Sequence, residues 1–280
     1  MFVDIRHDTL NIDERLIEGA LSERTRAIVP VHYAGIGCAM DAIAEIAARH
    51  RLRVVEDAAQ ALGSTYRRRS LGTIGDLGCW SFHETKNLIS GEGGALVVQD
   101  RDLVERAEIV REKGTDRSKF FRGQVDKYTW IDVGSSYLPS ELVAAYLFAQ
   151  LEKSEEILAK KRLIFERYRA ALAPLERAGL VRLPSIPPDC EPNGHLFYLI
   201  VGDEETRDAL LRHLDASGVN AVFHYVPLHE SPAGRRVGRW AGDMAVTETL
   251  SRRLIRLPSF VGMRDEQQER VIAAVTRFFG

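Results

Sequence analysis

The chain has 280 residues, of which 45% are hydrophobic and 28% are charged, and its formal net charge at pH 7 is −2. A chain of this length and composition forms a globular protein with a substantial core in one or two domains. Acidic and basic residues are interspersed and nearly balanced, so nothing in the charge pattern indicates a partner such as DNA or a membrane surface.

Three cysteines, Cys38, Cys79 and Cys190, lie far apart and lack the paired spacings of a zinc site or a disulfide framework. The histidines do not follow a metal-binding motif either, so no metal is expected. The residues after Met1 have neither a basic start nor a long apolar stretch, and no run elsewhere approaches membrane-spanning length. We therefore expect a protein of the reducing cytoplasm.

Helix and strand patterns alternate along the first half of the chain. Short apolar runs predict strands at residues 27–32, 53–56, 78–81 and 95–98, and the spacing of apolar residues at 40–50 predicts an amphipathic helix. Strands that alternate with helices are typical of an α/β fold.

A long helical pattern then runs from Ser140 to about Leu172, and Pro174 is expected to end it. Its apolar residues are predicted to crowd one face: Leu142, Ala145, Tyr146, Ala149 and Leu151. This helix is expected to bridge a large domain over residues 1–155 and a small C-terminal domain over residues 156–280.

The rest of the chain predicts a small α+β domain. An apolar run indicates a strand at residues 196–201, and Gly218 closes a helix predicted at 204–217. A last amphipathic helix is predicted at 264–279.

Asp57 is the first candidate for chemistry. It stands at the carboxyl end of a predicted buried strand, and ligands of open α/β sheets bind at that edge. A carboxylate there can pair with a pyridine nitrogen and keep it protonated, which makes the ring an electron sink. Gln60, three residues on, is placed to reach a hydroxyl of the same ring. By itself, Asp57 also fits the N-cap of a strand-to-helix turn.

Lys86 is the second candidate. An amine at this position is useful if burial and a nearby cationic ring lower its pKa, because it can then attach to an aldehyde and carry a proton. Ser81, shortly before it, is suited to donate to a phosphate oxygen, and the glycines at 91–94 let backbone pass close to a ligand. Each residue alone is more often structural or solvated, so the order and spacing of the set carry the hypothesis.

The chain resembles the sugar aminotransferases of the DegT/DnrJ/EryC1/StrS family over essentially its whole length. Six motifs carry the resemblance: VPVHYAG (29–35), EDAAQ (56–60), LGTIG (71–75), SFHETKN (81–87), GEGG (91–94) and FHYVPLH (223–229). It implies an α/β protein with the PLP-dependent transferase fold (aspartate aminotransferase fold type I), in which a large mixed-sheet domain precedes a smaller α+β domain.

The resemblance also implies pyridoxal 5'-phosphate as cofactor. Lys86 would be the lysine that attaches it and acts as catalytic base, and Asp57 the catalytic carboxylate that pairs with the ring nitrogen. Gln60 would contact the ring hydroxyl and Ser81 the phosphate. Ser136 stands where many members have an asparagine that reaches the phosphate of the neighbouring subunit.

Three further segments are similar to the subgroup that makes dTDP-4-amino-4,6-dideoxy-D-galactose: REKGT (111–115), FFRGQVDKYTW (120–130) and GSSYL (134–138). This implies a homodimer that moves the amino group of glutamate to carbon 4 of dTDP-4-dehydro-6-deoxy-D-glucose, for cell-surface polysaccharide synthesis. The dehydratase branch of the family has a histidine at the lysine position, so Lys86 favours amino transfer.

Seven residues are candidates for substrate contacts: His32, His83, Arg122, Lys127, Tyr128, His224 and Tyr225. An arginine offers a fork to phosphate and a tyrosine a face to a ring, and the resemblance places the loop of residues 223–229 near the sugar. Other interpretations stay open, namely a capped turn for His83, ordinary packing for His224, and a solvated loop for residues 122–128.

Members of the family begin upstream of the segment that matches residues 2–5. The chain is therefore expected to lack an N-terminal part with a helix N-terminus that holds the cofactor phosphate. Three alternatives remain: an inactive homologue that cannot retain cofactor, a nucleotide-sugar binding module, and a nicotinamide-dependent oxidoreductase. The last is disfavoured because no Gly-x-Gly-x-x-Gly follows a strand.

Overall fold

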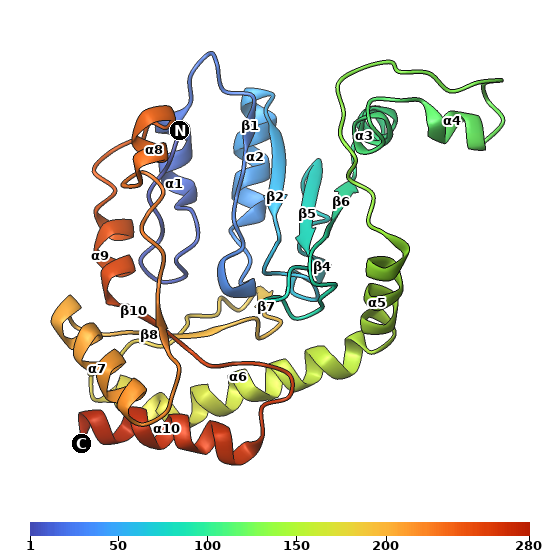
Figure 1. Ribbon diagram of the computed structural model, residues 1–280. Coiled ribbons are helices and arrows are strands. Elements are labelled where there is room, and N and C mark those ends of the chain that lie inside the picture. The colour runs from blue at the N-terminus through green and yellow to red at the C-terminus, as the bar shows by residue number, and fades with distance from the viewer.

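A mixed four-stranded sheet forms the centre of the molecule. The computed structural model describes all 280 residues. The sheet has the order β1-β2-β5-β6, in which β1, β2 and β5 are parallel and β6 is antiparallel to β5. Figure 1 shows these strands side by side: β1 (Ala27–Ile28), β2 (Arg53–Asp57), β5 (Leu77–Ser81) and β6 (Gly94–Val98). The predicted α/β class is confirmed.

Helix α2 (Met40–His50) has the predicted bounds and packs against β1 and β2. Its Met40, Ile43 and Ile46 are buried. Strand β1 is shorter than predicted, because the ladder is interrupted at Pro30, which has no N–H to donate. Beyond the proline, only an isolated pairing of Val31 with Asp57 continues the strand.

The chain also forms two smaller sheets, of which the first connects its two halves and the second lies within its C-terminal half. The first, in the order β4-β3-β7, joins β3 (Thr65–Tyr66) and β4 (Arg69–Ser70) to β7 (Cys190–Glu191). The second is antiparallel, in the order β8-β10-β9, and consists of β8 (Phe197–Ile200), β10 (Leu254–Leu257) and β9 (Val222–Phe223). The predicted strand at 196–201 is thus present in this second sheet.

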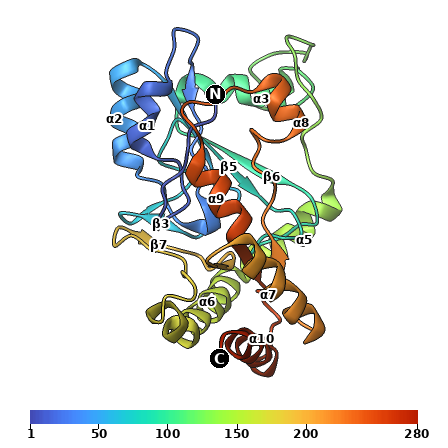
Figure 2. The same ribbon diagram turned by 90° about the vertical axis from the view of Figure 1, so that its left-hand side faces the viewer.

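Helices cover the second sheet on one side. Figure 2 shows α6 (Ser154–Arg177) and α10 (Asp265–Phe279) at the bottom of the molecule, with α7 (Glu204–Ala216) packed on α10. Two hydrophobic clusters result. One has 22 buried residues around α2 and the central sheet, and the other has 18 buried residues around α6, α7 and α10.

The long helix predicted from Ser140 to Leu172 is wrong in two respects. It consists of two helices, α5 (Glu141–Glu152) and α6, separated at Lys153. Pro174 lies inside α6 rather than after it, since a proline in the last turn removes a single hydrogen bond while Leu172 and Leu175 stay buried. The apolar residues of α5 are not packed within this chain, and Leu142 is 85% exposed.

The remaining helices are short. Five are α-helices: α1 (Glu14–Ile17), α3 (Val104–Arg111), α4 (Arg117–Phe121), α8 (Pro232–Val237) and α9 (Ala245–Arg253). Three are single 3-10 turns: η1 (Glu18–Ala20), η2 (Tyr33–Gly35) and η3 (Arg101–Leu103). No helix combines the length and the apolar character that crossing a bilayer requires.

Candidate active site

Asp57 and Ser81 lie at the same edge of the central sheet. Strands β2 and β5 run parallel with Asp57 paired to Cys79, so the carboxyl ends of both strands meet there. The segments that leave this edge, at Gln60 and at residues 84–87, line a cavity of about 990 Å³. The opposite wall comes from α6 and from the antiparallel sheet around β10.

Lys86 reaches into this cavity from the turn after β5. Burial lowers the pKa of its ammonium, and the charges of Asp57 and Tyr225 oppose the shift without cancelling it. A lysine with a lowered pKa has a larger fraction of neutral amine, which is the reactive form toward a carbonyl carbon.

Asp57 is held by its backbone and keeps its carboxylate largely available. Its N–H donates to the carbonyl of Pro30 at 2.9 Å, and its carbonyl accepts from the N–H of His32 at 3.0 Å. The side chain accepts one hydrogen bond, from the N–H of Ala59 at 3.1 Å. The N-cap interpretation is wrong, because a turn and not a helix follows β2; the single contact to Ala59 leaves the other carboxylate oxygen for a partner.

Gln60 lines the cavity from the turn after β2. Its Oε1 accepts from the N–H of Ala34 at 2.7 Å, which orients the side-chain amide so that its N–H groups remain to donate. Ser81 lies deeper, at the end of β5, where its Oγ accepts from the N–H of His83 at 3.3 Å. Its hydroxyl hydrogen is left for an acceptor.

His32 and Glu56 form a fully buried pair beneath this edge. The Nε2 of His32 lies 2.9 Å from Oε2 of Glu56. Its Nδ1 accepts from the N–H of Cys38, so the ring proton points to the carboxylate. Glu56 also accepts from three backbone N–H groups of residues 72–75. His32 therefore lies in the core, where it has no surface open to a substrate.

His224 and Tyr225 approach the cavity from the segment after β9. Burial lowers the pKa of His224 to about 4, and the charge of Arg256 adds to the effect. Its Nδ1 lies 3.3 Å from the hydroxyl of Tyr33. Tyr225 lines the cavity, and the guanidinium carbon of Arg256 lies 5.0 Å from the centroid of its ring.

Nine of the twelve predicted site residues are not part of the cavity lining: the four described above (Asp57, Ser81, His32 and His224) and five more. His83 bonds to Thr85, at 2.9 Å between Nδ1 and Oγ1. The other four are exposed on the segment from α4 to α5, shown at the upper right of Figure 1: Arg122, Lys127, Tyr128 and Ser136. Arg122 is occupied there by Glu108, at 2.7 and 2.8 Å.

Most of the cavity lining was not predicted, and three of its unpredicted residues bear on the chemistry: His195, Lys161 and Arg256. His195 has its pKa lowered to about 3, by burial and then by the charges of Lys86, Lys161 and Arg256. Lys161 is 3% exposed, and burial lowers its pKa to about 8. Arg256 projects from the middle of β10.

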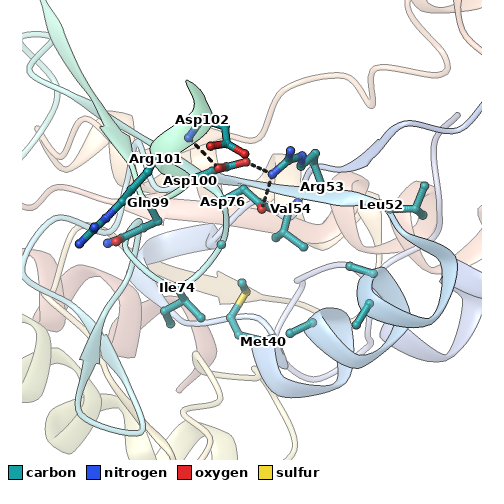
Figure 3. A pocket seen from close by; sticks show the side chains of 14 residues that line it. Met40, Leu52, Arg53, Val54, Ile74, Asp76, Gln99, Asp100, Arg101 and Asp102 are labelled. Carbon is teal, nitrogen blue, oxygen red and sulfur yellow. Dashed lines mark hydrogen bonds and ion pairs between the residues drawn. The ribbon is translucent and has the colours of Figure 1, made fainter. Parts of the chain in front are cut away.

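A second hollow, of about 600 Å³, lies at the opposite edge of the sheet, where β2 begins and β6 ends. Figure 3 shows Met40 and Ile74 facing its interior and Arg53 turned toward Asp76 and Asp100. It contains no amine or imidazole, so chemistry at a carbonyl carbon belongs to the cavity around Lys86.

Comparisons with known proteins agree with this geometry. The chain matches the DegT/DnrJ/EryC1/StrS aminotransferase family over residues 1–276. It belongs to this family. It is 36% identical to dTDP-3-amino-3,4,6-trideoxy-alpha-D-glucose transaminase of Streptomyces venezuelae, over 98% of this chain and 69% of that one.

Other relatives extend the comparison. GDP-perosamine synthase of Caulobacter vibrioides is 33% identical over 98% of this chain and 72% of its own length. The crystal structure of S. venezuelae DesV superposes with a TM-score of 0.86 at 35% identity, over 99% of this chain and 71% of that one. The predicted PLP-dependent transferase fold, and aminotransferase as the class of enzyme, are confirmed.

Enzymes of the DegT/DnrJ/EryC1/StrS family use pyridoxal phosphate, and the residues of this chain fit that group. Lys86 is partly buried and has a lowered pKa, and the charge of Asp57 acts on it. One carboxylate oxygen of Asp57 has no partner within the chain. An amide donor and a serine hydroxyl flank the pair at the same edge of the sheet. These are the partners that an aldehyde, a pyridine nitrogen, a ring hydroxyl and a phosphate require.

Proposed function

We propose that the protein transfers the amino group of glutamate to carbon 4 of dTDP-4-dehydro-6-deoxy-D-glucose and so forms dTDP-4-amino-4,6-dideoxy-D-galactose. The observation that carries the proposal is the pair of Lys86 and Asp57 at one edge of the sheet, beside a cavity large enough for a nucleotide sugar. Glutamate and the keto sugar would use this cavity in turn.

Each site residue has a defined part in this proposal. Lys86 would hold the cofactor through its amine, and the neutral amine would serve as the base that carries the proton of the reacting substrate carbon. Asp57 keeps the ring nitrogen protonated, and Gln60 donates to the ring hydroxyl. Ser81 donates to the phosphate. The bound cofactor supplies a conjugated ring that withdraws electrons from the carbon that loses its proton.

The sugar would lie on the side of the cavity formed by His224 and Tyr225. Tyr225 is exposed there and offers an aromatic face, while burial keeps His224 neutral at pH 7. Residues 156–280, which supply this wall, would act as the small domain that closes over residues 1–155.

A homodimer is part of the proposal. Apolar side chains are exposed along the segment from α4 through α5: Phe121, Tyr128, Trp130, Ile131, Val133, Tyr137, Leu138, Leu142, Tyr146, Phe148 and Leu151. A continuous apolar surface of this kind marks a contact between proteins. A second copy packed on it would bring Ser136 to the phosphate in the neighbouring site, within a cytoplasmic enzyme.

The first test is labelling of the purified protein. After incubation with pyridoxal phosphate and reduction with borohydride, peptide mapping should find the adduct on Lys86. The loaded enzyme should then form one 2-oxoglutarate per site from glutamate alone and should turn over repeatedly only with an acceptor sugar. A panel of dTDP- and GDP-linked 3-keto and 4-keto sugars identifies the acceptor, and the proposal requires the dTDP-linked 4-keto sugar to be the best one. An adduct scattered over surface lysines, and not on Lys86, would contradict the proposal.

A further inference from the structure

Arg256 has no acidic partner in the folded chain. It lies in the middle strand of the antiparallel sheet, paired with Tyr198 on one side and Val222 on the other. No carboxylate lies within 4.0 Å of its guanidinium, and its Nε is buried without a hydrogen-bond partner. Its contacts are a long hydrogen bond from Nη2 to the carbonyl of Phe223, at 3.4 Å, and the ring of Tyr225.

A half-buried guanidinium with an unused N–H group is costly unless a ligand completes it. An arginine carries five donors in a rigid fork, and leaving one unsatisfied in a buried position is unfavourable. The guanidinium lies against the ring of Tyr225, with its carbon 5.0 Å from the ring centroid, and Arg256 lines the cavity, where its unused N–H groups can donate to an anion. The geometry is that of a site for a planar anion.

The cavity as a whole carries an excess of positive charge. Lys86, Lys153, Lys161 and Arg256 line it, against the two carboxylates of Glu84 and Glu156. Glu156 is already paired with Lys160, at 2.9 Å. Lys161 donates to the carbonyl and the hydroxyl of Ser259, at 2.9 and 2.6 Å, which uses two of its three N–H groups. The charge of Asp57 acts on Lys86, but neither Lys161 nor Arg256 has a carboxylate within 4.0 Å.

Arg256 is also placed close to the reactive amine. The guanidinium of Arg256 lies over the ring of Tyr225. The charge of Tyr225 in turn raises the pKa of Lys86. His195 is within the influence of Lys86, Lys161 and Arg256 together. Because Lys86 and Arg256 line the same cavity, a ligand that reacts at Lys86 can also contact Arg256.

We propose that Arg256 binds a carboxylate of the dicarboxylic amino donor while that donor reacts at Lys86. The inference rests on the proposed function for the identity of the donor. An amino acid reacts at the carbon that carries its carboxylate, so a planar, forked cation beside the amine selects for it. Lys161 adds positive charge in the same cavity, which favours a donor with two carboxylates over one with a single carboxylate.

Glutarate tests the inference without any reaction, because it has two carboxylates and no amine. Its affinity for the cofactor-loaded protein is measured by calorimetry. The substitution Arg256→Gln should weaken binding roughly 10- to 100-fold, since a charge-assisted hydrogen-bond pair is lost. Arg256→Lys keeps the charge but loses the fork and should weaken it less. Arg252→Gln is the matched control, because Arg252 is exposed and paired with Glu230, and it should bind glutarate as the wild type does.

Titration with dTDP separates this site from one for the nucleotide phosphates. Affinity for dTDP should be the same in the wild type and in Arg256→Gln. The inference fails if the wild type does not bind glutarate, if Arg256→Gln binds it equally well, or if dTDP binding is lost instead. Because no turnover is involved, glutarate binding that depends on Arg256 in a protein that transfers no amino group would refute the proposed function alone. Arg256→Lys carries the test if Arg256→Gln does not fold.

Discussion

Two arginines in strands differ in how their charges are balanced. Arg53 begins β2 at one edge of the central sheet, where it pairs with Asp76, at 3.1 Å, and with Asp100. Both carboxylates have further internal partners, because Asp76 accepts from the N–H of Val54 and Asp100 caps a helical turn. Arg256, in β10, has no carboxylate at all.

The contrast separates two hollows of the same molecule. In the hollow of Figure 3, Arg53 is paired with Asp76 and Asp100, and the other charged residues, Arg101 and Asp102, are exposed to solvent, so no buried charge is left without a partner. In the cavity around Lys86, by contrast, the buried Lys161 and the half-buried Arg256 form no ion pair within the chain. Unbalanced charge, more than the shape of a hollow, distinguishes a site from a surface depression.

Removing the amine of Lys86 should have the largest effect. In Lys86→Ala we expect the borohydride-stable adduct to disappear and amino transfer to fall on the order of 10⁴-fold or more, because no other amine can attach the cofactor. The fold should be kept, as shown by an unchanged circular dichroism spectrum. Lys153→Ala, which removes an exposed amine from the lining of the same cavity, should keep the adduct. Full activity in Lys86→Ala would contradict the proposed chemistry.

Glu56→Gln should give the largest loss of stability. Glu56 accepts from His32 and from the N–H groups of Gly72, Ile74 and Gly75, and the last two residues line the hollow in Figure 3. A glutamine places an NH₂ group against these donors. The expected cost is roughly 3–5 kcal/mol, that of breaking a buried charged pair. Urea unfolding measures it, and a loss below about 1 kcal/mol would contradict this account.

The same residue makes stability depend on pH. Burial by itself would raise the pKa of Glu56, but hydrogen bonds from His32 and from the amides of Gly75 and Gly72 bring the pKa below its usual 4.5. A group with a lowered folded-state pKa contributes stability that is present above its unfolded pKa and is lost as the pH falls through the folded value. Unfolding free energy should therefore drop below about pH 4.5, and Glu56→Gln should lack this part of the drop.

The sequence predicts the central sheet better than the cavity. Helix α2 and strands β2, β5 and β6 lie within a residue of their predicted bounds, because short apolar runs between polar turns have strong periodicity. The division of the long helix at Lys153 has no local signal, since neither proline nor glycine stands there. Lys86, Asp57 and Gln60 were predicted at the sheet edge from their order along the chain, and their roles stay predictions.

The far wall of the cavity required the structure. Lys161 interrupts a buried stripe of α6 that includes Ile157, Ile164 and Tyr168, and Arg256 interrupts the apolar strand β10. A charge within an apolar stripe is a usable signal, but it does not tell which distant strand the charge will face. That Lys161 and Arg256 meet Lys86 follows from the packing of the antiparallel sheet against the central one.

Asp57→Asn should reduce turnover without preventing attachment of the cofactor. Asparagine keeps the size of aspartate and the hydrogen bond from the N–H of Ala59, but it cannot hold a proton on the ring nitrogen. We expect the adduct on Lys86 to form and single-turnover amino transfer from glutamate to slow on the order of 100-fold, as for the loss of one preorganised charge. An unchanged rate would show that Asp57 does not face the ring nitrogen. Stopped-flow absorbance measures the rate, and Asp76→Asn at the opposite edge is the control.

Arg53→Gln should have the smallest effect, and it completes the comparison of the two arginines. Its partners Asp76 and Asp100 are near the surface, so the ion pairs contribute about 0–1 kcal/mol to the free energy of unfolding. The substitution removes the same kind of guanidinium as Arg256→Gln, but one that is already paired with two carboxylates. Glutarate affinity and the adduct on Lys86 should stay as in the wild type. A glutarate affinity reduced as much in Arg53→Gln as in Arg256→Gln would mean that net charge of the protein, and not an unpaired guanidinium in the cavity, attracts the dicarboxylate.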